Sequence, residues 1–272
     1  MLIDSHAHLD DEAFDADREA VLARAREAGV VAIINVGYNE RRWETTAALC
    51  AAHAGVYAVL GLHPHEAATW DAALAERLRA ALRGPRVVGL GEIGLDFYRD
   101  HAPRDAQRAA FRAQSALARE LELPVVIHSR SAEDEAVTLL AEAGITRGVL
   151  HSYSGSLATA ERALERGLYL SLTGPISYPK AEHQRDLARA IPLERLLLET
   201  DCPYLAPQAR RGRRNEPAFL PYTAEAIAAA RGSTVAEVGA ATTLNAARLF
   251  GLDAGYEHPN QADEYVPLGN GA

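Results

Sequence analysis

Short runs of β-type residues alternate with longer helical patterns from one end of the chain to the other. Eight runs are rich in Val, Ile and Leu and apolar nearly throughout, which is typical of strands covered on both faces. The predicted strands span residues 2–9, 30–37, 56–63, 87–94, 124–129, 148–153, 169–173 and 196–201. Between them, strong helix formers dominate, and helices are predicted at 15–28, 41–52, 72–83 and 104–122. Strands that alternate with helices pair in parallel through βαβ crossovers, so the pattern indicates an α/β fold.

Eight strand–helix units are the number that closes a TIM (β/α)8 barrel, and a doubly wound open sheet is the alternative. The chain has 272 residues, within the range of one such barrel, and no internal repeat. We predict one domain over residues 1–252 and a poorly ordered tail over 253–272, which lacks periodicity. Two helix starts have the spacing of a capping box, namely Ser131 with Asp134 and Thr234 with Glu237.

Nearly every predicted strand ends in a side chain that can bind a metal ion or a proton. The first strand carries Asp4, His6 and His8, which share one face because strand side chains alternate with period two. In a TIM barrel the C-terminal ends of the strands surround one mouth, where the active site lies, whereas an open sheet would spread them along a line. This convergence favours the barrel. The other groups at strand ends are His63, Glu92, His128, His151 and Asp201.

Taken singly, these histidines are weak signals, because an HxH pair or a lone histidine is more often structural. A buried carboxylate is harder to explain, since its burial without a partner is costly. Imidazole with carboxylate suits zinc, manganese, iron or, with more oxygen ligands, magnesium. Six candidate ligands exceed the three that one hydrolytic ion takes from protein. We therefore predict two divalent metal ions bridged by Glu92, with His6, His8 and Asp201 on one ion and His128 and His151 on the other.

Seven motifs, in order along the chain, resemble those of the TatD family. They are DSHAHLD (4–10), GLHPHEA (61–67), GEIGLDFY (91–98), IHSR (127–130), HSYSG (151–155), ETDCPYLAP (199–207) and RRNEP (213–217). The GEIGLD and ETDxPYL blocks together are specific, whereas many amidohydrolases share the HxH pair. One departure is HSYSG, where members commonly have HCFSG. Ser152 and Tyr153 flank the predicted ligand rather than replace it, so the departure concerns substrate contacts.

The resemblance implies a TIM-barrel hydrolase that depends on divalent metals, and several members are deoxyribonucleases with a 3′–5′ exonuclease preference for single strands. By this likeness the six predicted metal ligands carry over, namely His6, His8, Glu92, His128, His151 and Asp201. The expected substrate is nucleic acid, above all single-stranded DNA, whose phosphodiester bonds are cleaved by a metal-activated water.

Roles within the site follow as hypotheses. Asp201 orients or deprotonates the attacking water, and the predicted catalytic set is Asp201, Glu92 and His63. His63 and His65 donate hydrogen bonds to the scissile phosphate. Guanidinium groups bind flanking phosphates bidentately, from Arg130 and from a run that includes Arg211, Arg213 and Arg214. Aromatic rings can stack on bases of a single strand, and the candidates are Tyr98, Tyr153 and Tyr204.

Three other functions stay open at this stage. Binuclear amidohydrolases and phosphotriesterases often bridge their metals with a carboxylated lysine at the end of the fourth strand. The only lysine here, Lys180, lies beyond the seventh, which counts against that class but not against mononuclear deaminases. A TatD-like deacylase that removes D-amino acids from tRNA could use the same metal site on an ester. A non-catalytic binding barrel would have lost ligands, and this chain has a full set.

The composition of the chain limits its possible partners and its cellular compartment. A net charge of −9 argues against broad binding to duplex nucleic acid, although four arginines within residues 210–214 could hold a polyanion locally. Two cysteines, Cys50 and Cys202, indicate free thiols in a reducing cytoplasm. The chain shows no signal peptide and no apolar run long enough to cross a membrane. We expect a cytoplasmic protein with no obligate protein partner.

Overall fold

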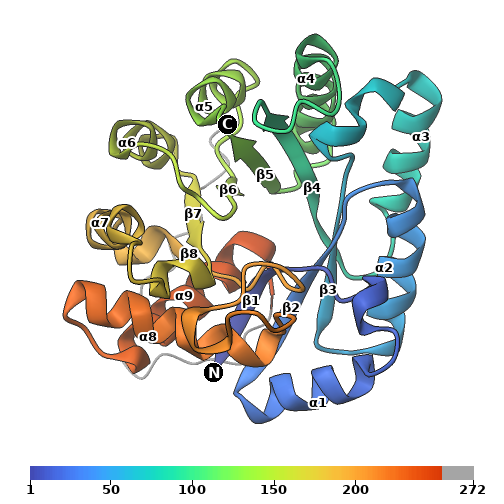
Figure 1. The fold of residues 1–272 in the computed structure, drawn as a ribbon. Coiled ribbons are helices and arrows are strands. Elements are labelled where there is room, and N and C mark those ends of the chain that lie inside the picture. Colours follow the sequence, from blue (N-terminus) through green and yellow to red (C-terminus); the bar gives the residue numbers. More distant parts are fainter. Residues whose placement is uncertain (253–272) are drawn as a thin grey trace, which may run out of the picture.

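Eight parallel strands follow one another around a barrel in the order β1 to β8, as Figure 1 shows. The computed structural model describes residues 1–252. The ring closes where Ala7 pairs in parallel with Cys202, and the His8 amide donates to the Cys202 carbonyl over 2.8 Å. The TIM (β/α)8 barrel is thus confirmed and the open sheet is excluded. The strands are β1 (Leu2–Ala7), β2 (Val30–Gly37), β3 (Val56–Leu60), β4 (Val87–Asp96), β5 (Val125–Arg130), β6 (Gly148–Leu150), β7 (Tyr169–Leu172) and β8 (Leu196–Leu198).

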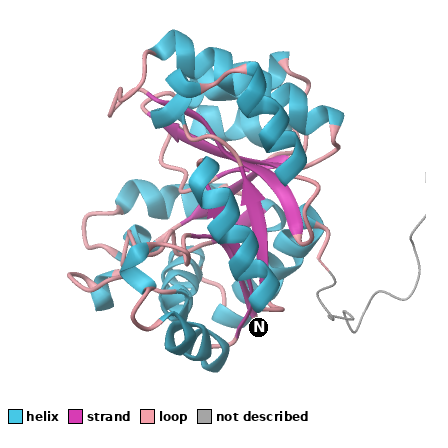
Figure 2. Ribbon diagram, turned by 90° about the vertical axis from the view of Figure 1, so that its right-hand side faces the viewer, coloured by secondary structure: helices cyan, strands magenta, loops and turns pink. Residues whose placement is uncertain are grey.

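Helices form the outer layer of the barrel, and Figure 2 shows them outside the strands. They bury apolar side chains beneath them and expose most of their charged residues, although Arg42 of α2 is buried. The four helices predicted from composition are all present, with ends shifted by a few residues. The α-helices are α1 (Arg18–Glu27), α2 (Glu40–Ala52), α3 (Ala72–Ala81), α4 (Arg104–Glu120), α5 (Glu133–Glu142), α6 (Leu157–Glu165), α7 (Glu182–Ala190), α8 (Leu220–Arg231) and α9 (Val235–Phe250).

The inside of the barrel is apolar at one end and polar at the other. Val126, Val149 and Leu197 are fully buried in one cluster. Because strand side chains alternate, each shares its face with the polar residue two positions later, namely His128, His151 or Glu199. The same apolar cluster includes Leu249 and Phe250 of α9. Helix α9 therefore closes the N-terminal end of the barrel, and the polar residues lie at the opposite end.

Several strands end earlier than predicted, because the backbone turns away from the ladder at the mouth. Strand β3 stops at Leu60 and β8 at Leu198, so His63 and Asp201 stand on the loops that follow. Asp201 has a left-handed backbone with φ 55°, which no continuing strand adopts. These two groups thus sit just after their strands, whereas His6, Glu92 and His128 lie within theirs.

One predicted capping box is confirmed and the other is wrong. Thr234 caps α9 reciprocally with Glu237. At the start of α5, however, Ala132 occupies the cap position without a side-chain hydrogen bond. Ser131 has φ 53°, so its backbone is left-handed and not the extended form that a capping serine needs. Asp134 instead pairs with Arg162 of α6.

Both cysteines are free and buried, as predicted. Burial raises the pKa of the Cys50 thiol to about 12 and that of the Cys202 thiol well above its usual range. Within residues 1–252 no helix combines the length and the apolar character needed to cross a bilayer. The predicted tail over 253–272 lies outside the described residues.

Candidate metal centre

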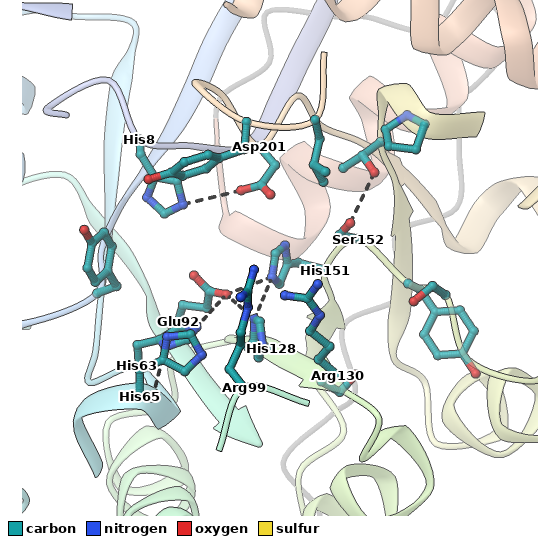
Figure 3. A pocket seen from close by; sticks show the side chains of 18 of the residues that line it. His8, His63, His65, Glu92, Arg99, His128, Arg130, His151, Ser152 and Asp201 are labelled. Carbon is teal, nitrogen blue, oxygen red and sulfur yellow. Dashed lines mark hydrogen bonds and ion pairs between the residues drawn. The ribbon is translucent and has the colours of Figure 1, made fainter. Parts of the chain in front are cut away.

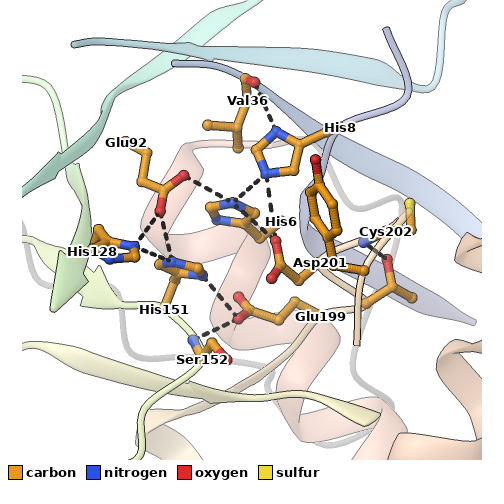
Figure 4. Close-up of polar contacts among 12 residues, drawn as sticks. His6, His8, Val36, Glu92, His128, His151, Ser152, Glu199, Asp201 and Cys202 are labelled. Carbon is orange, nitrogen blue, oxygen red and sulfur yellow. Dashed lines mark hydrogen bonds and ion pairs between the residues drawn. The ribbon is translucent and has the colours of Figure 1, made fainter. Parts of the chain in front are cut away.

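Four histidines and two carboxylates, donated by five strands and their following loops, meet at the mouth of the barrel (Figure 4). The Nε2 atoms of His6 and His8 lie 3.3 Å apart. Asp201 reaches this pair with Oδ1 at 3.4 Å from His8 Nε2 and 3.7 Å from His6 Nε2. The group forms because the Asp201 amide donates to the His6 carbonyl over 2.9 Å, which seats the end of β8 against β1.

Glu92 stands between this group and a second set of imidazoles. Its Oε2 lies 3.5 Å from His6 Nε2. Its Oε1 lies 2.8 Å from His128 Nδ1 and 2.8 Å from His151 Nε2. Those two imidazole nitrogens are 3.4 Å apart. The two oxygens of one carboxylate therefore face different sets of histidines, as the sequence-based division predicts.

His63 joins the second set. Its Nε2 lies 3.6 Å from Glu92 Oε1, and its donor atom falls in one group with those of Glu92 and His128. From the sequence we predict that His63 is a catalytic residue that donates a hydrogen bond to the scissile phosphate. The structure places it among the possible ligands.

The spacing of these atoms fits divalent cations. Donor atoms that share one tetrahedral ion at about 2.0–2.1 Å lie about 3.3–3.4 Å from one another. In the first set, made by His6, His8, Asp201 and Glu92 Oε2, the three separations from His6 Nε2 and the one between His8 and Asp201 lie between 3.3 and 3.7 Å. Two imidazole nitrogens that face each other this closely bind each other well only when one is protonated. A cation between them satisfies both lone pairs, and so the residues present fit the metal ions that the donor set implies.

Charge in the cluster also calls for cations. Burial raises the pKa of the Glu92 carboxyl, but His151 and His63 outweigh it and lower that pKa well below its usual value. The pKa of the Asp201 carboxyl is also lowered. Burial raises this pKa, but the neighbouring His8 and His6 lower it by more. Burial lowers the pKa of His63 to about 4, so this imidazole is neutral near pH 7.

Glu199 is a functional candidate that our sequence interpretation missed. Its carboxylate is fully buried, and Oε1 accepts from the Ser152 amide over 2.6 Å and lies 3.4 Å from His151 Nδ1. The rings of His6 and His151 stack with centroids 4.0 Å apart, and one donor atom of each groups with Glu199. Glu199 thus lies beside the imidazoles on the side away from Glu92 (Figure 4).

Asp96 is the second missed residue. It is fully buried at the end of β4 and holds two imidazoles through Oδ2, which lies 2.9 Å from His65 Nε2 and 3.1 Å from His128 Nε2. The Tyr98 and Arg99 amides donate to its other oxygen. Asp96 therefore orients His128 from behind and ties His65 to the same wall.

A cavity of about 800 Å³ opens above the cluster (Figure 3). Of the predicted substrate-binding residues, His63, His65, Arg130 and Tyr153 line it. Tyr153 is only 2% exposed, however, and its hydroxyl donates to the Ser156 carbonyl over 2.7 Å. Its ring therefore packs under the loop and has little surface for a stacked base.

The arginine run lies outside the cavity. Among the described residues that line it, neither Arg211 nor Arg213 is found. The Arg211 guanidinium lies over the Tyr178 ring, 5.1 Å from its centroid. Arg214 pairs with both carboxylate oxygens of Asp17 over 2.8 Å, which anchors the loop to the start of α1. Phosphate binding by Arg211 and Arg213 stays a prediction.

Comparison with known proteins gives relatives along almost the whole chain. The model of the TatD related DNase family matches residues 3–251. A protein of Erwinia amylovora named 3′-5′ ssDNA/RNA exonuclease TatD is 40% identical over 259 residues, which cover 92% of this chain and all of the relative. A protein of Bacillus subtilis named uncharacterized metal-dependent hydrolase YabD is 38% identical over 255 residues, which cover 93% of this chain and all of that protein.

The fold agrees with this relationship. The crystal structure of YJJV, a TatD homologue from Escherichia coli, superposes with a TM-score of 0.88 at 35% identity and covers 92% of this chain and 98% of that one. The family model spans residues 3–251, which include all eight strands of the barrel. The chain therefore belongs to the TatD related DNase family, a family of hydrolases.

Proposed function

We propose that the protein is a nuclease that depends on two divalent metal ions and hydrolyses phosphodiester bonds of single-stranded nucleic acid. The observation that carries the proposal is Glu92, whose two oxygens face two separate sets of imidazoles at 2.8–3.5 Å. His6, His8 and Asp201 would hold one ion, and His128 and His151 the other, with Glu92 between them. His63 lies close enough to join the second set.

Bound ions of this kind polarise a phosphate, lower the pKa of a water and stabilise the leaving oxygen. The chain's own residues supply orientation and proton transfer. Asp201 carries a negative charge at neutral pH and lies at the cavity floor, where it can accept the proton of the attacking water. The neutral His65 ring donates its Nε2 N–H to Asp96, which leaves Nδ1 as an acceptor, so the predicted hydrogen bond from His65 to the phosphate would require a doubly protonated ring. Glu92 holds the two halves of the site together.

The relatives support the substrate class. Several, including the Erwinia amylovora protein, are named 3′-5′ ssDNA/RNA exonucleases. We extend that activity to this chain, with single-stranded DNA as the first substrate to test. The amidohydrolase alternative loses support, because Lys180, the only lysine, does not line the cavity among the described residues and cannot bridge metals there.

Product analysis tests this proposal. Single-stranded DNA labelled at either its 3′ or its 5′ end is incubated with protein that carries magnesium, manganese or zinc. We expect a ladder that shortens from the 3′ end, activity that a chelator removes and a divalent metal restores, and slow cleavage of duplex DNA. Full activity with metal only at trace level would contradict the metal assignment. Release of amino acid from D-aminoacyl-tRNA without DNA cleavage would favour the deacylase instead.

Glu199 gives a separate prediction. A carboxylate behind a ligating histidine fixes the ring tautomer, and removal of such a partner typically weakens metal binding 10–100-fold. We expect Glu199→Ala to lower metal affinity about that much, because His151 Nδ1 loses the carboxylate that lies 3.4 Å away from it. Glu199→Gln keeps an acceptor oxygen and should restore part of the affinity. Isothermal titration calorimetry of the metal-free proteins with zinc measures the metal affinity of both variants. Equal affinities for wild type and Glu199→Ala would contradict the role of Glu199 in metal binding.

A further inference from the structure

Two exposed arginines project into the cavity beside the metal centre. Arg99 follows β4 and Arg130 ends β5. Both line the cavity, and Figure 3 shows their guanidinium groups directed inward next to His128 and His151. The wall formed by the ends of β4 and β5 is therefore positively charged just where it borders the carboxylate–imidazole cluster.

Neither guanidinium has a carboxylate partner among residues 1–252. The side-chain contacts found for Arg99 and Arg130 are with the ring of Tyr98 alone. Two arginines close by in the sequence are paired, Arg104 with Asp100 over 2.7 Å and Arg108 with a glutamate of α5. Acidic groups are thus at hand along this loop and helix, yet the two cavity-facing guanidinium groups keep all their N–H donors available to a ligand.

Tyr98 holds the two arginines in place. Its ring is 63% exposed, and the Cζ atoms of Arg130 and Arg99 lie 4.4 and 5.6 Å from its centroid. Stacking on an aromatic face restricts a guanidinium without using its donors. The pair is therefore ordered before a ligand arrives, which lowers the entropy cost of binding.

The opposite wall has a different character. The loops after β7 and β8 contribute Pro175 and Leu205, together with Tyr204, which is 54% exposed. A ligand that fits both walls is anionic on one side and flat and apolar on the other. One unit of a polynucleotide has this character, since its phosphate is charged and its base presents an apolar face.

We propose that Arg99 and Arg130, held on Tyr98, bind the phosphate next to the scissile one, while the adjoining base packs against the wall made by Pro175, Tyr204 and Leu205. This subsite rests on the proposed nuclease function. It makes the preferred substrate a strand with at least two successive phosphates. It also separates the two tasks of the cavity: the metal centre holds the phosphate that reacts, and the arginine pair holds its neighbour.

A scan of neutral linkages tests the proposal. Fluorescent single-stranded oligonucleotides each carry one methylphosphonate, which removes the charge of one phosphate. Their binding to Asp201→Asn protein is followed by anisotropy, because this variant is expected to cleave slowly enough for binding to be measured. We expect one position, adjacent to the phosphate at the metal centre, to weaken binding about tenfold or more, as loss of charge-assisted hydrogen bonds does. In protein that also carries Arg99→Gln and Arg130→Gln, that penalty should vanish.

Salt dependence gives a second readout. Each phosphate contact with single-stranded nucleic acid contributes about 0.7 to the slope of log affinity against log salt. Loss of the shared phosphate contact should lower the slope by about that amount. Arg83→Gln, which removes an exposed arginine on the loop after α3 and outside the cavity, is the matched control and should keep both slope and penalty.

The outcomes separate two failures. A methylphosphonate penalty that is as large in the Arg99→Gln/Arg130→Gln protein as in its parent overturns the arginine subsite. An unchanged salt slope in that variant does the same. Failure of the nuclease proposal is recorded independently, as absence of cleavage of the unmodified strand by the wild-type protein with any of the three metals.

Discussion

Asp201→Asn is expected to lower turnover on single-stranded DNA by about 10²–10⁴-fold, the usual contribution of a positioned general base, while the protein stays folded. The asparagine amide cannot accept a proton from water and is a weaker ligand beside His6 and His8. The fold should tolerate the change because Asp201 has φ 55°, and asparagine is among the few residues that adopt this left-handed backbone readily. Initial rates, with circular dichroism as the folding check, measure the effect.

Asp100→Asn provides the matched control. Asp100 also has a left-handed backbone, with φ 49°, and stands on the loop after β4, but its carboxylate pairs with Arg104 and does not line the cavity. The same chemical change there should leave the rate within about twofold, as surface changes usually have small effects. Equal activity of the Asp201→Asn protein and the wild type would remove Asp201 from the mechanism.

Gly94→Ala is expected to destabilise the fold by about 3–5 kcal/mol, at the upper end for a single substitution. Gly94 has φ +142°, which L side chains rarely adopt, and a Cβ built there would lie 1.9 Å from the His128 carbonyl oxygen. The methyl group must therefore push β4 away from β5 at the residue where they pair, Gly94 with His128. The midpoint of urea unfolding measures the loss, and the spread of β4 from β5 should also weaken metal binding.

Gly29→Ala separates the close contact from the backbone conformation. Gly29 also has a positive φ, +81°, but nothing lies within 4 Å of its built Cβ. This variant should lose only about 1–2 kcal/mol, the cost of a left-handed backbone alone. If both glycine variants unfold at the same urea concentration, the tight approach of β4 to β5 is not what requires glycine at residue 94.

The barrel and its six candidate ligands could be predicted because both depend on short-range patterns. Apolar runs of strand length repeat along the chain, and the rule that parallel strands end at one mouth brings His6, Glu92 and Asp201 together. No contact had to be known in advance. Strand ends were less certain, because the turn at each mouth residue depends on its neighbours in space, as the left-handed Asp201 illustrates.

Glu199 and Asp96 could have been found by the same alternation. Glu199 stands two residues before Asp201, and Asp96 stands four after Glu92, so each shares a strand face with a predicted ligand. The arginine run was different. Arg214 meets Asp17 across 197 residues of sequence, and no local pattern foretells which of several adjacent arginines an ion pair will hold. Arg99 gave no signal either, since its lack of a carboxylate partner is visible only in three dimensions.

Helix α9 determines how substrate can enter the active-site cavity and how product can leave it. Because Leu249 and Phe250 plug the barrel at its far end, residues 1–252 leave the catalytic chamber no rear outlet. In the proposed nuclease, a released nucleotide would leave through the mouth of the barrel, through which the next part of the strand enters. Substrate and product would then share this one opening, so we expect accumulated mononucleotide to inhibit competitively.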